Sequence, residues 1–179
     1  MRFIRFTRLV IITVFFASTA QATVVISQQT LDQTLLDAQI ALEKQDYPQA
    51  FVLYQTAAQW GHKGAQYVLG ELYLRGKGVE RDAVVGYAWL EVASEAPDRE
   101  FRKARTAAGK TLSDEQKQQA DELAQKLVST YGLDAAGITC RKEMRLGSNI
   151  KEVNCYHVNT TPGGDLIVPD GEVDLDPAS

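Results

Sequence analysis

Apolar residues recur at helical spacing through most of the chain. Four of them follow at steps of four, three and four residues and form one face of a helix: Leu31, Leu35, Ala38 and Leu42. The segment Asp46-Tyr47-Pro48 separates this helix from the next, since proline is tolerated in the first turn of a helix but not inside one. The second helix ends near Gly61. The pattern therefore predicts a helical hairpin from about Thr30 onward.

A second hairpin repeats this plan. Its first helix has an inward face of Ala65, Leu69, Leu72 and Tyr73. Gly76 and Gly78 bracket a tight loop, because glycine reaches positive φ without a steric penalty. Asp82 is placed to cap the following helix. A shift of 36 residues moves Asp46 onto Asp82 and Phe51 onto Tyr87, and such a fixed offset indicates stacked helical hairpins.

A later helix closes the predicted helical region. Ser113 and Gln116 have the spacing of a capping box, in which each side chain bonds the other residue's backbone. We expect an inner face of Gln116, Ala120, Leu123 and Leu127, with Lys117 in water. The helix ends at Gly132. A stack of hairpins needs such a terminal element to cover its last apolar face.

The second hairpin resembles the Sel1-like repeat, a relative of the tetratricopeptide repeat. The resemblance rests on Ala65-Gln66, Leu69-Gly70, Tyr73, Gly76-x-Gly78, Asp82, Tyr87, Trp89-Leu90 and Ala93. The first hairpin lacks the Leu-Gly and Gly-x-Gly features, and its Lys44–Tyr47 turn is closer to a tetratricopeptide repeat. The resemblance implies an all-α domain over residues 28–131, a short α-solenoid of helical hairpins with a capping helix, and a protein-binding role.

The composition changes after Gly132. Two short runs rich in β-branched residues, 138–144 and 150–158, flank a Gly-Ser pair that is typical of a two-residue hairpin turn. With that turn, residues whose numbers sum to 295 face one another, so Cys140 lies opposite Cys155. The region 132–160 is thus predicted to be a small disulfide-stapled β-hairpin, with a helical turn after Ser148 as the alternative.

The last segment, 161–179, contains glycine, proline and acidic residues but no lysine or arginine. Its five acids are Asp165, Asp170, Glu172, Asp174 and Asp176. Segments of this composition bury too little apolar surface to fold on their own. We expect a flexible acidic tail.

Residues 1–22 have the form of a cleavable signal peptide. Three arginines precede an apolar core, and Ala20-Gln21-Ala22 has the small-x-small form that signal peptidase needs. An uncleaved signal anchor is the alternative. Cleavage would remove three of the 19 basic residues and none of the 23 acids, so the net charge would move from −4 to −7. Binding to nucleic acid is not expected of so acidic a chain, nor is stable membrane insertion after cleavage. The predicted location is the periplasm, with secretion possible.

The sequence offers little catalytic chemistry. His62 and His157 have no nucleophile or carboxylate at a motif spacing, so structural roles are expected for both. The two cysteines are too far apart for a Cys-x-x-Cys redox pair and are expected to form a structural disulfide. The alternating acids near the C-terminus lack the glycine and final glutamate of a calcium loop. We expect no enzyme, cofactor or metal site.

One helical stripe remains as a candidate for partner contact. Tyr67, Glu71 and Leu74 lie away from the predicted core face, although Tyr67 and Leu74 would serve equally well to touch a neighbouring helix. The predicted function is that of an adaptor or scaffold for an envelope protein or peptide. A cell-wall or small-molecule binding module that uses the hairpin is the alternative. Hydrolysis of β-lactams, known for some relatives, fits less well because those bear a cysteine pair within each repeat.

Overall fold

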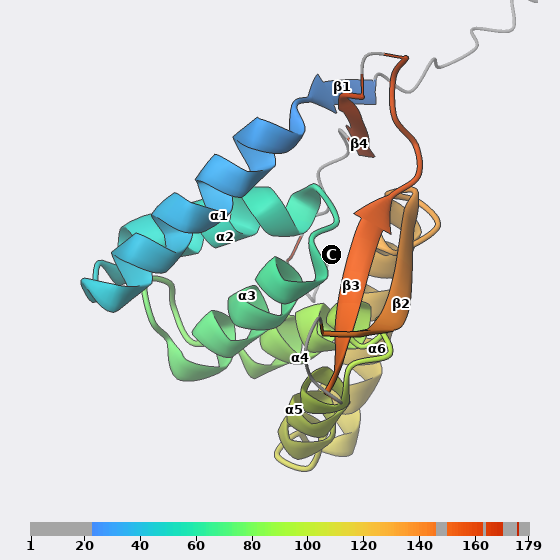
Figure 1. Ribbon diagram of the computed structural model, residues 1–179. Coiled ribbons are helices and arrows are strands. Elements are labelled where there is room, and N and C mark those ends of the chain that lie inside the picture. Colours follow the sequence, from blue (N-terminus) through green and yellow to red (C-terminus); the bar gives the residue numbers. More distant parts are fainter. Residues whose placement is uncertain (1–22, 146–149, 163, 170–174, 176–179) are drawn as a thin grey trace, which may run out of the picture.

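The computed structural model describes residues 23–145, 150–162, 164–169 and 175 (Figure 1). The described residues form six helices and four strands. The helices are α1 (Gln28–Glu43), α2 (Tyr47–Gln59), α3 (Lys63–Arg75), α4 (Ala83–Ala93), α5 (Arg99–Gly109) and α6 (Asp114–Tyr131). The strands are β1 (Thr23–Ile26), β2 (Ile138–Met144), β3 (Lys151–His157) and β4 (Leu166–Pro169). The predicted signal peptide lies outside the described residues.

The first four helices form two successive hairpins, α1 with α2 and α3 with α4. The two aspartates that the 36-residue shift relates each cap a second helix. Asp46 accepts a hydrogen bond from the Gln49 amide at 3.3 Å, and Asp82 accepts from Val84 and Val85 at 2.9 Å. The predicted repeat is therefore confirmed at the level of the caps.

Two glycines allow α3 and α4 to cross closely. A Cβ atom on Gly70 would lie 2.8 Å from the carbonyl oxygen of Gly86 and 2.9 Å from Leu90. A Cβ atom on Gly86 would lie 2.9 Å from the Gly70 carbonyl. The Leu-Gly element of the repeat thus sets how near the two helices approach, and it buries Leu69 and Leu90 completely.

α4 lies at the centre of the helical region and packs against α3, α5 and α6. Trp89 of α4 stacks on Tyr131 of α6 with ring centroids 5.6 Å apart. The capping box of Ser113 and Gln116 is present, and Ala120, Leu123 and Leu127 are buried as predicted.

Two expectations for α6 were wrong. Gln116 is exposed, because its side chain accepts a hydrogen bond from the Ser113 amide in the capping box instead of facing inward. Lys117 is half-buried, with its ammonium 4.3 Å from the centre of the Tyr87 ring, where a cation is attracted to the ring face. The start of α6 therefore packs by polar and cation–π contacts, whereas its later turns pack by apolar ones.

β2 and β3 form an antiparallel hairpin in the predicted register. Cys140 pairs with Cys155, their numbers sum to 295, and the two are joined by a disulfide. The predicted Gly-Ser turn lies outside the described residues. The hairpin is fixed to the helices near its base, where Ala136 and Ile138 pack against Gly61 so closely that a Cβ atom there would meet both within 2.7 Å.

β1 and β4 form a second small sheet that the sequence analysis did not predict. They pair antiparallel, with Val24 opposite Val168 and Ile26 opposite Leu166. Leu166 and Val168 are buried in the main core, and Leu175 packs against the same core. The prediction of a flexible tail is therefore wrong for Leu166–Pro169, since these two apolar side chains hold the strand on the helices. Within the described residues, no helix combines the length and apolar character that a membrane span requires.

Candidate interaction surfaces

The predicted contact stripe on α3 is turned towards α4 and α5. Tyr67 stacks on Phe101 of α5, with ring centroids 4.9 Å apart and planes 22° from parallel. Burial raises the pKa of the Tyr67 hydroxyl, and the charge of Glu71 adds to the effect. Leu74 packs with the side chains of the α4 core, and Glu71 forms an ion pair with Arg75. Tyr67 and Leu74 do touch neighbouring helices, so any partner would meet only their outer edges and Glu71. Their role in binding stays a prediction.

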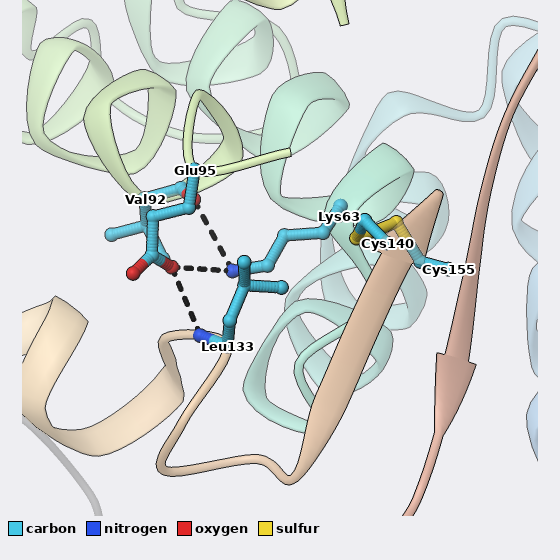
Figure 2. Close-up of a disulfide and its surroundings, with 6 residues drawn as sticks. All are labelled: Lys63, Val92, Glu95, Leu133, Cys140 and Cys155. Carbon is cyan, nitrogen blue, oxygen red and sulfur yellow. Dashed lines mark hydrogen bonds and ion pairs between the residues drawn. A yellow bond between two sulfur atoms is a disulfide. The ribbon is translucent and has the colours of Figure 1, made fainter. Parts of the chain in front are cut away.

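A buried ion pair holds the start of α3 in place. The Lys63 side chain is only 2% exposed, and its ammonium donates to Glu95 at 2.8 Å and to the Val92 carbonyl at 3.2 Å (Figure 2). The same Glu95 oxygen accepts from the Leu133 amide at 3.0 Å. Burial lowers the pKa of Lys63, while the Glu95 carboxylate opposes that shift. This network joins α3, the end of α4 and the segment that leads into β2.

A cleft opens between this junction, α1 and the hairpin, with a volume of about 450 Å³. Its apolar wall consists of Leu31, Leu35, Ile138 and Leu166. His62 and His157 contribute its imidazoles, one from the start of α3 and one from the end of β3. The two histidines are 95 positions apart in the sequence, so no local motif could have indicated that they line one cleft.

Both imidazoles are neutral at pH 7. His62 caps α3 through its Nδ1, which accepts from the Ala65 amide at 3.0 Å. Burial lowers the pKa of His62 to about 4, and His157 lowers it further while Asp32 opposes the shift. Burial also lowers the pKa of His157. A neutral, partly apolar cleft of this kind suits the binding of a peptide or small molecule.

The sequence-predicted site residues are thus not brought together. The disulfide lies at the cleft, whereas Tyr67, Glu71 and Leu74 lie along α3 beside α4 and α5. Over the ranges that the structure describes, no three His, Cys, Asp or Glu side chains are placed to hold a metal ion. The expectation that the histidines have structural roles holds for His62, because it caps a helix.

Two further cavities continue along the hairpin. One of about 490 Å³ lies between β3 and the starts of α3 and α5, and includes Gly64, Phe101 and Tyr156 in its lining. The other, of about 540 Å³, lies between the hairpin and residues 97–100 and includes Lys142 and Lys151. Together with the first cleft they follow the whole length of β3.

The comparison with protein-family models matches the region of the helical hairpins. Residues 40–62 and 64–98 match the Sel1 repeat. The chain therefore contains two adjacent segments that are similar to the Sel1 repeat. The first match includes the turn that resembles a tetratricopeptide repeat, and the second covers α3 and α4.

One solved structure is similar, a protective antigen of uropathogenic Escherichia coli strains that displays an SLR fold. It is 32% identical, with a TM-score of 0.48, over 57% of this chain. The match covers only 23% of the antigen's own length. The comparison with curated proteins gave no match.

Proposed function

We propose that this protein is an exported adaptor that binds another envelope protein or peptide. The observation that carries the proposal is the pair of adjacent Sel1 repeats, because repeats of this fold generally mediate protein–protein interaction. The Cys140–Cys155 disulfide and the signal-like residues 1–22 support an oxidising compartment such as the periplasm. No chemistry at the cleft is required by this role.

Cross-linked pull-down from periplasmic extract tests the proposal. The mature, oxidised protein serves as bait, and captured proteins are identified by mass spectrometry. We expect one dominant partner, with capture reduced by Glu71→Lys if the α3 stripe contributes. Glu80→Lys makes the same change of charge at an exposed loop position and is the matched control. Absence of any protein above the level of an unrelated bait would refute the adaptor role.

A second candidate function is binding of cell-wall material or a small molecule. The cleft of about 450 Å³ favours it, as does the excess of basic residues in the hairpin, four against two acidic ones between Cys140 and Cys155. Co-sedimentation with purified peptidoglycan tests this role. Retention that disappears when the cleft is altered by Leu35→Glu, with capture of proteins unchanged, would favour it over the adaptor.

A further inference from the structure

One edge of β3 carries backbone groups that no described residue uses. The Val158 amide donates to Gly137 at 2.7 Å, and the Arg145 amide donates to Ile150 at 3.0 Å. These two bonds fix the pattern, because hydrogen-bonded positions alternate along an antiparallel pair. Residues 152, 154 and 156 therefore bond to β2. The amides and carbonyls of the intervening residues point away from β2, and these are Lys151, Val153, Cys155 and His157. The Cα atoms of Cys140 and Cys155 are 4.0 Å apart, as expected for a non-bonded pair.

The cavities described above open along this same edge. All seven residues of β3 line at least one of the three cavities, and each cavity is bordered by consecutive strand residues. Successive strand residues point to opposite faces of a sheet. A cavity lined by consecutive residues therefore lies along the edge of the strand and not over one face. The residues opposite the strand come from α1 and from the starts of α3 and α5. The edge therefore borders a groove about 23 Å long, at roughly 3.3 Å per residue.

The start of β4 already pairs with the backbone that continues the open edge of β3. Just beyond β3, the Ile167 amide donates to the Asn159 carbonyl at 3.1 Å, and Thr160 forms an isolated bridge with Leu166. The Val158 amide is bonded to Gly137, so the neighbouring Asn159 carbonyl points to the side away from β2. β4 thus occupies the far end of the edge and then pairs with β1, which leaves the length of β3 open to a further strand.

The groove differs in chemistry between its ends. At the β4 end it is lined by the apolar side chains of Leu31, Leu35, Ile138 and Leu166. At the other end it presents three cations, Arg99, Lys142 and Lys151, and no described carboxylate pairs with any of them.

The acids at the cationic end are already engaged. Asp98 accepts from the first amides of α5, Glu152 pairs with Arg145, and Glu100 lies 3.9 Å from Lys103. The lining of this end is balanced, with three cations and three acids, but the hairpin has four basic residues against two acidic ones between Cys140 and Cys155, and this excess favours an acidic occupant.

We infer that the edge of β3 binds an extended, acidic segment of a partner protein as an added strand. Main-chain hydrogen bonds to Lys151, Val153, Cys155 and His157 hold the segment. Its apolar side chains enter the cleft beside Leu31, and its acids meet the cationic end. Strand addition to an open edge is a common mode of peptide recognition. This inference deepens the proposed adaptor function and rests on it, because it names the chemistry of the partner.

Fluorescence anisotropy with a labelled synthetic peptide of alternating valine and glutamate tests the inference. The full mature, oxidised chain should bind this peptide, and Val153→Pro should weaken binding at least about fivefold by removing one amide from the open edge. Met144→Pro is the matched control, since it removes an outward amide from the other edge of the hairpin and should change binding less than about twofold. A valine–lysine peptide should bind at least about fivefold more weakly, because it meets the cationic end with like charge.

The peptide can also be altered, which keeps the test valid if Val153→Pro does not fold. Two peptides are compared, one N-methylated at its valine amides and the other at its glutamate amides. Only one of these sets of amides can face β3, so one peptide should lose binding and the other should keep it. Equal binding of both N-methylated peptides, or no binding up to millimolar concentration, overturns the inference. Peptide binding that appears only when residues 170–179 are removed also overturns the inference. It would assign the groove to the chain's own C-terminal segment.

The two proposals can fail separately. A natural partner that is captured equally well by Val153→Pro and by the unaltered protein would leave the adaptor role standing and refute strand addition. Peptide binding with no captured partner would support the groove's chemistry and refute the adaptor role.

Discussion

Removal of the Glu95 carboxylate should be among the most damaging single changes outside the apolar core. Glu95 neutralises the ammonium of Lys63, which is 2% exposed and whose second acceptor among the described residues is the Val92 carbonyl. Glu95→Ala leaves this buried charge without a counter-ion and removes the acceptor of the Leu133 amide. The change should therefore loosen both the start of α3 and the segment that anchors the hairpin.

The expected magnitude follows from burial. Loss of one partner from a buried ion pair costs about 3–5 kcal/mol, because the remaining charge is left unpaired in a poorly solvated site. The Glu95 side chain is itself 26% exposed, so water can reach the vacated position, and we expect the lower end of that range, about 3 kcal/mol. Lys63→Met should cost less, about 2 kcal/mol, because the remaining carboxylate keeps contact with water and the Leu133 amide.

Urea denaturation followed by circular dichroism, with the disulfide intact, measures these values. Glu91→Ala is the matched control, because Glu91 lies four residues before Glu95, on α4. Its carboxylate accepts from Arg105 and from the Tyr87 hydroxyl, each at 3.0 Å, but the side chains of Glu91 and Arg105 are about one third exposed. That exposed pair should contribute below about 1 kcal/mol. The double variant Lys63→Met/Glu95→Ala should cost less than the sum of its two single changes by about 1 kcal/mol or more. The reasoning is refuted if Glu95→Ala costs no more than Glu91→Ala.

Three further predictions concern pH, backbone shape and the disulfide. Burial lowers the pKa of His62 to about 4 in the folded protein, against 6.5 for the free side chain, so the unfolded chain binds more protons between these two values. The contribution of neutral His62 to the free energy of unfolding should therefore be fully present above pH 6.5. It should fall by about 3 kcal/mol on acidification to pH 4. His62→Asn keeps a cap acceptor but does not titrate, and a pH profile as steep as that of the unaltered protein would contradict this assignment. Gly78→Ala should cost at least about 2 kcal/mol, because φ is +77° and a Cβ atom would lie 2.1 Å from the Tyr47 carbonyl oxygen. Gly164 also has a positive φ, +88°, but no atom lies within 4 Å of a Cβ added there. Gly164→Ala therefore measures the cost of the backbone conformation alone in the same denaturation assay, and it should cost clearly less than Gly78→Ala. Replacement of both cysteines by alanine should cost about 3 kcal/mol by freeing a loop of 15 residues, and a melting temperature equal to that of the oxidised protein would exclude this contribution.

The sequence predicts well those parts of the fold whose interactions are local or periodic. Asp82 and Ser113 mark the starts of their helices in the sequence, because an N-cap side chain bonds backbone amides within the next three residues. The register of Cys140 and Cys155 follows from one turn, since a hairpin has period two and a single pairing fixes all the others.

Features that depend on distant parts of the chain were not predictable in this way. β1 and β4 are four residues each and lie at opposite ends of the described chain, so their pairing leaves no local pattern. Lys63 has the appearance of an exposed helical lysine, and only the approach of Glu95 explains its burial. The groove along β3 likewise arises from three helices and a strand that no motif connects.

Hydrogen–deuterium exchange of the mature protein, alone and with its captured partner, tests most directly the claim that this chain is a protein-binding module. The account predicts slower exchange on complex formation at Lys151, Val153, Cys155 and His157, whose amides face the open edge of β3. Exchange of the β2-bonded amides at residues 152, 154 and 156 should change much less. Unchanged exchange throughout α3 and β3 in the presence of a saturating partner would contradict the account.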